Sequence, residues 1–285
     1  GNMGGAVLDG LLDSVFPNGE AASQPKPESR VSKFIAYTQS ARSAQRLQEK
    51  YSSRHASRVY VIQSRIIDAI GEADVVVLGF KPYMAQDVLL APGVREALRG
   101  KLVISMLAGL SSGEVLGLCA SGETSPIVTK AVPNMAARCR QSMTILELPD
   151  SGSIPPREAE LTEWIFSQVG SVKWLASGLV NAGSMLMTAC LATLSIPLEG
   201  LLDGSVAEGI RRADAMEIAV QGINGLGAML GTGMHPAALR ESISSPRGCT
   251  IQSLLTVEKA ATRAVFAQAL IDGTRHLQPA GDGKR

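Results

Sequence analysis

The first half of the chain alternates short apolar runs with segments of helical periodicity. Runs rich in β-branched residues predict strands at residues 33–38, 59–62, 74–79, 102–106 and 127–131. Apolar residues at helical spacing predict helices at residues 5–12, 41–51, 66–71, 88–98 and 112–119. The run at 74–79 suits a strand covered on both faces. This order predicts an α/β Rossmann domain with a doubly wound, mostly parallel sheet.

The pattern changes after residue 148. Pro155 and Pro156 open a helix that ends near Gln168, since proline is tolerated in a first helical turn. From residue 171 to residue 276 the pattern is almost purely helical, apolar and poor in aromatics. Such a region is expected to pack against a second copy of the chain. We therefore expect an NAD(P)-binding domain at 1–170, an all-α dimerisation and substrate domain at 171–278, and a tail at 279–285.

One stretch is long enough to cross a bilayer. Residues 174–198 contain no charged side chain. They do contain several serines and threonines, with Pro197 near the end. We therefore favour a helix buried in a protein core or a subunit interface over a membrane span.

Charge and composition narrow the partners. The 27 basic and 26 acidic residues give a net charge of +1, which argues against nucleic acid and acidic membranes as partners. The 45% hydrophobic content is enough for a sizeable core, so the expected ligand is a small molecule. The four cysteines and three histidines lie far apart, so we expect no metal site and no disulfide framework. Free thiols fit a reducing compartment, and the expected location is cytoplasmic.

The chain opens on a glycine turn. Gly1, Asn2, Met3 and Gly4 match the second half of the dinucleotide motif G-x-G-x-x-G. Gly1 would let the backbone approach a pyrophosphate, and Gly4 would allow close packing of helix and strand. The helix that follows would hold the phosphate charge at its N-terminus. The first glycine and strand of the motif are expected upstream of residue 1, which leaves a targeting segment there open.

The end of the second strand bears on the choice of cofactor. Enzymes that use NAD usually place an acidic residue there to bind the ribose 2′-hydroxyl. Residues 37–42 contain no acid, and Thr38, Ser40 and Arg42 are the candidate contacts. A guanidinium can hold a 2′-phosphate, so NADPH is favoured, with NADH possible. The alternative is that Arg42 is a solvated residue of the helix.

Two further strand ends would face the same crevice, because open α/β sheets bind ligands at the carboxyl ends of their strands. Phe80, Lys81 and Pro82 follow one strand, and Ala108 and Gly109 follow the next. Lys81 is either a charge partner of the ligand or a solubilising residue at the strand end.

A polar loop near the C-terminus precedes a helix. It runs over residues 244–250 and feeds a helix from Ile251 onward. Unpaired N–H groups at this helix start would suit a carboxylate, with hydroxyls from Ser245 and Thr250. The alternative is an ordinary N-cap by serine or threonine.

The order of these motifs resembles the pyrroline-5-carboxylate reductase family. The likeness covers most of the chain, including residues 1–4, 73–82, 105–109, 132–135 and 199–204. Its most specific part is His235-Pro236-Ala237-Ala238-Leu239 followed by the loop at 244–251, with Leu255 and Glu258-Lys259 beyond it.

The resemblance implies an NAD(P)H-dependent reduction of a cyclic imine, 1-pyrroline-5-carboxylate, to proline. It implies a Rossmann domain followed by a helical domain that interlocks two subunits into a homodimer or a larger oligomer. It places the substrate carboxylate on Ser245, Gly248, Cys249 and Thr250, with the Thr250 hydroxyl near the imine nitrogen as the catalytic group. Asn134 is placed with the cofactor.

Two segments depart from the family. Its Ser-Gly-Ser-Gly-Pro-Ala segment aligns without a gap to residues 187–192, which contain no glycine. The alternative is a remnant at Gly178-Leu179 and Gly183-Ser184, which would place about two extra helical turns before Glu199. The family's Pro-Asn-Thr-Pro segment becomes Pro133-Asn134-Met135-Ala136. Both lie near the expected site, so two alternatives stay open. One is a related reductase of another imine or oxo acid, and the other is a non-catalytic NADP-binding protein.

Overall fold

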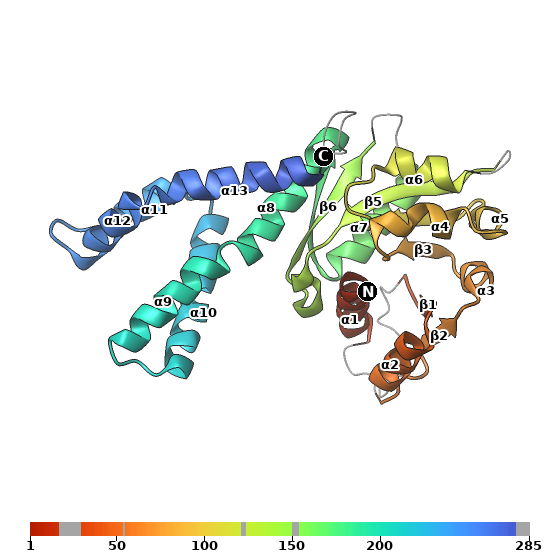
Figure 1. The fold of residues 1–285 in the computed structure, drawn as a ribbon, viewed down its shortest axis with the longest axis horizontal. Coiled ribbons are helices and arrows are strands. Elements are labelled where there is room, and N and C mark those ends of the chain that lie inside the picture. The colour runs from red at the N-terminus through yellow and green to blue at the C-terminus, as the bar shows by residue number, and fades with distance from the viewer. Residues whose placement is uncertain (17–29, 54, 121–123, 150–153, 278–285) are drawn as a thin grey trace. The chain divides into compact units, whose positions relative to one another are not determined.

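The computed structural model describes residues 1–16, 30–53, 55–120, 124–149 and 154–277, and these form two compact units. Unit 1 comprises Gly1–Ser184 together with Leu277, and unit 2 comprises Met185–His276. Figure 1 labels the elements of both units along the chain.

The strands of unit 1 form two sheets among the described residues. A parallel pair joins β1 (Phe34–Thr38) to β2 (Val59–Gln63). A five-stranded sheet has the order β3-β4-β5-β6-β7. Its strands are β3 (Val75–Leu78), β4 (Leu102–Ser105), β5 (Ile127–Val132), β6 (Ser142–Leu148) and β7 (Gly170–Ala176). All neighbours in this sheet are parallel except β5 and β6, so the predicted mostly parallel α/β architecture is confirmed.

Helices cover both faces of the five-stranded sheet (Figure 1). On one face α1 (Asn2–Val15) and α7 (Pro156–Ser167) pack Leu11 and Phe166 against Ile104. The other face is covered by short helices, which are α3 (Ile66–Gly71), α4 (Ala85–Leu89), α5 (Val94–Leu98) and α6 (Ser112–Cys119). A smaller cluster joins α1 to β2 and to α2 (Ala41–Tyr51) through Leu12, Tyr51 and Val59. The burial of both faces explains why β3 and most of β4 are apolar runs.

Within the described ranges, three 3₁₀ turns connect these elements: η2 (Pro82–Met84), η3 (Met135–Cys139) and η4 (Ser177–Leu179). The helix η3 packs closely against α1. A Cβ atom on Gly10 would overlap the carbonyl oxygen of Ala137 and would lie 2.9 Å from Val169 Cγ1. Only glycine therefore permits this approach, which fixes α1 on the sheet.

Unit 2 is helical. It contains the end of α8 (Val180–Ala192) and α9 (Ser195–Ala207), α10 (Arg212–Gly231), α11 (Pro236–Ser242), α12 (Cys249–Lys259) and α13 (Thr262–Leu277) up to His276. The helices α9 and α10 pack together, and α8 meets α13 where a Cβ on Gly273 would lie 2.6 Å from Met185 Sδ. Many large apolar side chains of this unit are exposed, among them Ile196, Leu201, Ile218 and Val265. Unit 2 therefore presents apolar surface that its own chain does not cover.

Two predictions about secondary structure are wrong. The region from residue 171 is not purely helical, because residues 170–176 form β7. Val172 and Trp174 pack on the core while Ser171 and Lys173 are exposed, which is the alternation of a strand. The predicted helix at 88–98 is also interrupted. It is divided between α4 and α5 because Pro92 cannot donate a hydrogen bond and Gly93 adopts φ +81°.

Most of the apolar stretch at 174–198 is helical, and residues 174–176 belong to β7. Residues Ser177–Ala207 make one helical run of 31 residues that is long and apolar enough to cross a membrane by length and composition alone. Within the chain only 11% of its most apolar window is buried. Of the two forms of burial expected from the sequence, a protein core or a subunit interface, this exposure favours the interface.

Candidate functional site

The glycine turn starts α1 and touches the end of β3. Gly1 is the N-cap of α1. It has no side chain that could accept a hydrogen bond from the first N–H groups of the helix. A Cβ on Gly1 would lie 3.2 Å from the carbonyl oxygen of Gly79, and one on Gly79 would lie 3.7 Å from Gly4 Cα. Gly1 thus lets the helix start approach the end of β3, whereas a Cβ on Gly4 would meet nothing within 4 Å, so close packing does not require glycine there. An uncapped helix start beside a strand end is the arrangement that a pyrophosphate requires.

Two cations stand near this turn. The charges of Arg46 and Lys81 both act at the backbone nitrogen of Gly1. Lys81 follows β3 and is exposed, and Arg46 lies on α2. Positive charge from two separate elements therefore favours an anion at the helix start. Arg46 was not among the residues predicted from the sequence. The available signal was its position four residues after Arg42, on the same face of a helix.

The contacts predicted at the end of β1 have distinct roles. Ser40 is the N-cap of α2, and its hydroxyl accepts from Ser43 N at 3.3 Å. The Thr38 carbonyl accepts from Ser64 N at 3.1 Å, which ties the end of β1 to the end of β2. Arg42 is exposed in the first turn of α2. Of these side chains, only that of Arg42 brings a positive charge to the loop.

A polar cluster holds α2 against α1. Lys50 Nζ donates to both carboxylate oxygens of Asp9 at 2.6 Å, and the Tyr51 hydroxyl donates to Asp9 Oδ1 at 2.9 Å. Burial and the bond to Asp9 raise the pKa of the Tyr51 hydroxyl well above its usual value. Asp9 lies on the helix of the glycine turn, and Lys50 and Tyr51 lie on the helix of Arg42 and Arg46. The cluster therefore fixes the arginines relative to the turn.

The ends of β3 and β4 lie beside the same turn. Phe80 packs into the core, and Pro82 begins η2 directly after Lys81. After β4, Ala108 is exposed and Gly109 has φ +81°, a conformation that favours glycine. A Cβ on Gly109 would lie 3.7 Å from the Leu277 carbonyl oxygen, which accepts from Asn181 Nδ2 at 3.4 Å. The loop after β4 thus lies beside the first turn of α8 and the last residue of α13.

Asn134 has a structural role in the turn after β5. Its side-chain oxygen accepts from Ala136 N at 3.1 Å and caps η3. Its own N–H donates to Ser142 Oγ at 3.1 Å. The buried amide therefore orders the turn that follows a strand end of the sheet.

The predicted substrate loop lies in unit 2 between α11 and α12. Gly248 N donates to the Ser245 carbonyl at 3.0 Å, and Arg247 has φ +60°, so residues 245–248 form a tight turn. A Cβ on Gly248 would overlap Ser245 Oγ and would lie 3.1 Å from the Ser245 carbonyl oxygen, so a side chain there would crowd the turn. Ser245 and Cys249 are exposed, and Thr250 is half-buried in the first turn of α12.

The start of α12 is open to a ligand. Its N-cap is Gly248, which has no side chain to cap it. The alternative of an ordinary serine or threonine cap is therefore wrong for this helix. Uncapped N–H groups beside two hydroxyls are suited to a carboxylate. The neighbouring α11 differs, because the His235 side chain caps it by accepting from Ala237 N at 3.2 Å.

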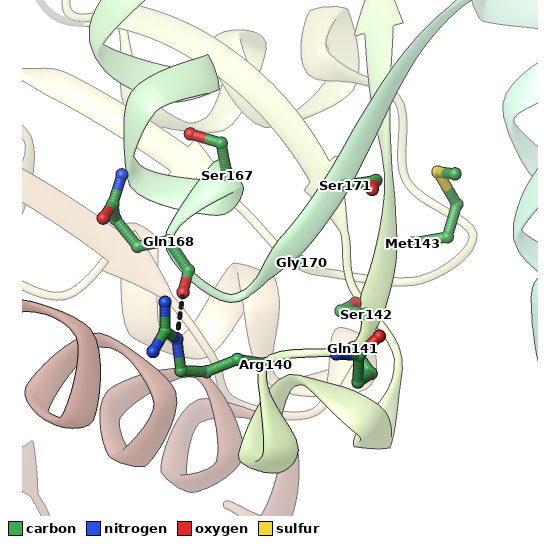
Figure 2. Close-up of a pocket in the computed structure, with 8 residues that line it drawn as sticks. All are labelled: Arg140, Gln141, Ser142, Met143, Ser167, Gln168, Gly170 and Ser171. Atoms are coloured by element: carbon green, nitrogen blue, oxygen red, sulfur yellow. Dashed lines mark hydrogen bonds between the residues drawn. The ribbon is translucent and has the colours of Figure 1, made fainter.

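A surface hollow lies elsewhere in unit 1, where β6 and β7 begin (Figure 2). Arg140 Nε donates to the Gln168 carbonyl across it at 3.2 Å. Gly170 lines its floor, where a Cβ would overlap backbone atoms of Ser142. None of the residues predicted to bind cofactor or substrate lines this hollow. The candidate sites are instead the two open helix starts.

Comparison with known proteins identifies both parts of the chain. Residues 178–279 match the family described as pyrroline-5-carboxylate reductase dimerisation. Residues 1–109 match the family described as NADP oxidoreductase, coenzyme F420-dependent.

Whole-chain relatives agree with these matches. A pyrroline-5-carboxylate reductase from Lophium arboricola is 35% identical over 99% of this chain and 92% of its own length. A pyrroline-5-carboxylate reductase from Neurospora crassa is 34% identical over 96% of this chain and 89% of its own length. The crystal structure of Plasmodium falciparum pyrroline carboxylate reductase with NADP bound shares the fold, with a TM-score of 0.78 and 19% identity over 98% of this chain and 94% of that one. The chain belongs to the pyrroline-5-carboxylate reductase family.

Proposed function

We propose that this protein reduces 1-pyrroline-5-carboxylate to L-proline with NADPH, the last step of proline biosynthesis. The observation that carries the proposal is the 35% identity to a named pyrroline-5-carboxylate reductase over 99% of the chain. Two uncapped helix starts support it, because the reaction needs one site for a pyrophosphate and another for a substrate carboxylate.

The residues around the first helix start fit a dinucleotide phosphate. A side chain on Gly1 would crowd the Gly79 carbonyl oxygen, and Arg46 and Lys81 supply positive charge. We assign Gly1, Asn2, Met3 and Gly4 to the pyrophosphate and Arg42 to the 2′-phosphate. Bound NADPH would supply the hydride that the imine carbon accepts. The remaining residues that we assign to cofactor binding follow the ends of strands. They are Thr38, Ser40, Phe80, Lys81, Pro82, Ala108, Gly109 and Asn134.

The second helix start would hold the imine. We assign its carboxylate to Ser245, Gly248, Cys249 and Thr250 and place the Thr250 hydroxyl at the imine nitrogen. The C=N carbon gains the hydride, the C=N π bond breaks, and the protonated nitrogen keeps its proton as an amine. A protonated imine is already electrophilic, so the protein's part is to orient the two reactants and exclude water.

Unit 2 is also proposed to join two subunits. Its family match is to a dimerisation domain, and its exposed apolar side chains are what a subunit interface would cover. We propose a cytoplasmic homodimer or larger homo-oligomer, with neither a membrane nor a nucleic acid as partner. The division of roles at residue 170, with cofactor binding before it and dimerisation and substrate binding over 171–278, stays a prediction.

One observation favours a second candidate. The helix α8 is unbroken from Val180 to Ala192, and residues 187–192 contain no glycine. A related imine with different substituents is therefore the alternative substrate. NADPH oxidation measured side by side on pyrroline-5-carboxylate, piperideine carboxylate and unsubstituted pyrroline decides between them. We expect the highest kcat/KM on pyrroline-5-carboxylate, whereas a preference for either other compound would contradict the proposed substrate.

The assignment of Arg42 makes a prediction about cofactor preference. Arg42→Ala should lower kcat/KM for NADPH about 10- to 100-fold and leave that for NADH unchanged, because only NADPH carries the 2′-phosphate. Arg46→Ala is the comparison, since a residue at the pyrophosphate should affect both cofactors equally. An Arg42→Ala enzyme that keeps its preference for NADPH would refute the assignment.

The interface assignment makes a second prediction. Ile196 in α9 is 71% exposed within the chain, and Ile196→Glu should weaken self-association at least about tenfold by placing a charge in an apolar interface. Light scattering over a concentration series measures this change. Leu90→Gln in unit 1, at a side chain that is 47% exposed, is the control and should leave the oligomer unchanged. Equal behaviour of both variants would contradict the assignment.

A further inference from the structure

Unit 1 buries two opposite charges that the reaction chemistry does not use. Lys130 on β5 is 4% exposed, and Glu147 on β6 is 2% exposed. Ala131 pairs with Leu146 in the antiparallel register of β5 and β6, so the neighbouring residues Lys130 and Glu147 occupy opposite positions. On the other side, Lys130 pairs with the buried Ser105 on β4. Buried charges cost more free energy than apolar side chains of similar size unless they are well paired. Stability alone therefore gives little reason to keep them in a sheet.

The carboxylate of Glu147 joins two separate segments. Its Oε2 atom accepts from the N–H of Ser112, the first residue of α6, at 2.8 Å. Its Oε1 atom accepts from the Ser177 hydroxyl at 2.5 Å, just before α8. One oxygen is thus bonded to the start of α6, and the other is bonded to Ser177, where the apolar helical run begins.

The opposite charge, on Lys130, lies near the start of α6. Burial lowers the pKa of the Lys130 ammonium, and the charges of Glu147 and Glu114 oppose that shift. Glu114 stands in the first turn of α6 and accepts from Ser111 N at 2.7 Å as part of a capping box. The charge of Lys130 therefore acts on two carboxylates, and both of these accept hydrogen bonds from N–H groups at the start of α6.

This helix start carries the loop that follows β4. Ser112 is three residues after Gly109, and at the other end of the loop Ser105 Oγ accepts from Leu107 N at 3.3 Å. Gly109 itself lies beside the Leu277 carbonyl that Asn181 contacts. Glu147 thus holds the end of this loop through its hydrogen bond with the N–H of Ser112. It also holds the segment before α8 through its hydrogen bond with the Ser177 hydroxyl.

We propose that Glu147 is a positioning residue for the reductase reaction: by its two hydrogen bonds, with Lys130 as counter-charge, it holds the Ala108–Gly109 loop in the conformation that binds the cofactor. The inference rests on the proposed function, which places that loop against NADPH. Glu147 touches neither reactant and acts through the first turn of α6.

The test compares NADPH affinity and thermal stability in purified variants of the full chain. Glu147→Gln keeps an oxygen for Ser112 N–H and an amide for the Ser177 hydroxyl, so we expect the Kd of NADPH to stay within about threefold of wild type. The double variant Lys130→Met/Glu147→Leu removes the hydrogen bonds and both charges together. It should fold, because apolar residues often replace a buried ion pair without loss of stability, yet the Kd should rise about tenfold or more.

Thr162→Val is the matched control. Thr162 is equally buried, and its hydroxyl donates to the Glu158 carbonyl at 2.7 Å on the opposite face of the sheet. It should lower Tm without changing the Kd of NADPH. A double variant with wild-type Kd, or a Glu147→Gln variant as impaired as the double variant, would overturn the proposal. A wild-type protein that binds NADPH but does not oxidise it with the imine contradicts only the proposed function, because the Kd comparison still decides the role of Glu147.

Discussion

Replacing Thr250 with alanine is expected to lower kcat/KM for pyrroline-5-carboxylate about 100-fold, because a hydrogen bond to a charged group at the reacting centre is lost. Thr250 stands in the first turn of an uncapped helix, directly after the turn at residues 245–248. Its backbone is thus held at the helix start that would receive the substrate carboxylate. Steady-state kinetics with varied imine at saturating NADPH measures the effect.

The controls for this prediction separate the substrate from the cofactor. Thr250→Ser keeps the hydroxyl and should retain activity within about fivefold of wild type. The Kd of NADPH should be unchanged in Thr250→Ala, since the glycine turn and its cations lie in unit 1. Equal losses of NADPH affinity and of kcat/KM would refute the assignment of this loop to the substrate.

Gly10→Ala is expected to lower the free energy of unfolding by about 2–3 kcal/mol. The added Cβ would overlap the Ala137 carbonyl and lie 2.9 Å from Val169 Cγ1, so α1 would have to move away from η3. Because α1 begins at the glycine turn, the same movement should weaken NADPH binding. Denaturant unfolding gives the stability change, and fluorescence titration gives the affinity.

Gly117→Ala is the matched control for the helix position. Gly117 is an exposed interior residue of α6, and a Cβ there meets nothing within 4 Å. Alanine should therefore raise the free energy of unfolding by about 0.5–1 kcal/mol through its better helix propensity. If Gly10→Ala were as stable as Gly117→Ala, the close contact between α1 and η3 would be contradicted.

The sequence was sufficient for most elements of unit 1, because the central strands β3 and β4 read as apolar runs and the other predicted strands are rich in β-branched residues. The strand β7 was missed since it follows directly after α7 and begins a region of helical composition. Its alternation of Val172 and Trp174 with exposed residues covers only seven residues. The division between α4 and α5 was also missed, although Pro92-Gly93 is a recognisable break.

The parts of the candidate site that depend on local backbone geometry were predictable from the sequence. The glycine turn and the loop before α12 are both local motifs, and both lie at uncapped helix starts. Arg46 and Glu147 depend instead on which elements pack together. The role of Glu147 follows from bonds to residues 35 and 30 positions away, which no local pattern encodes.

The most direct test of the account follows the hydride itself. NADPH deuterated at the transferred C4 position is incubated with the enzyme and pyrroline-5-carboxylate, and the product is examined by mass spectrometry and NMR. The account predicts L-proline formed mole for mole with NADP⁺, with one deuterium at C5, the former imine carbon. NADPH that is bound but not consumed, or proline that carries no deuterium at that carbon, would contradict it.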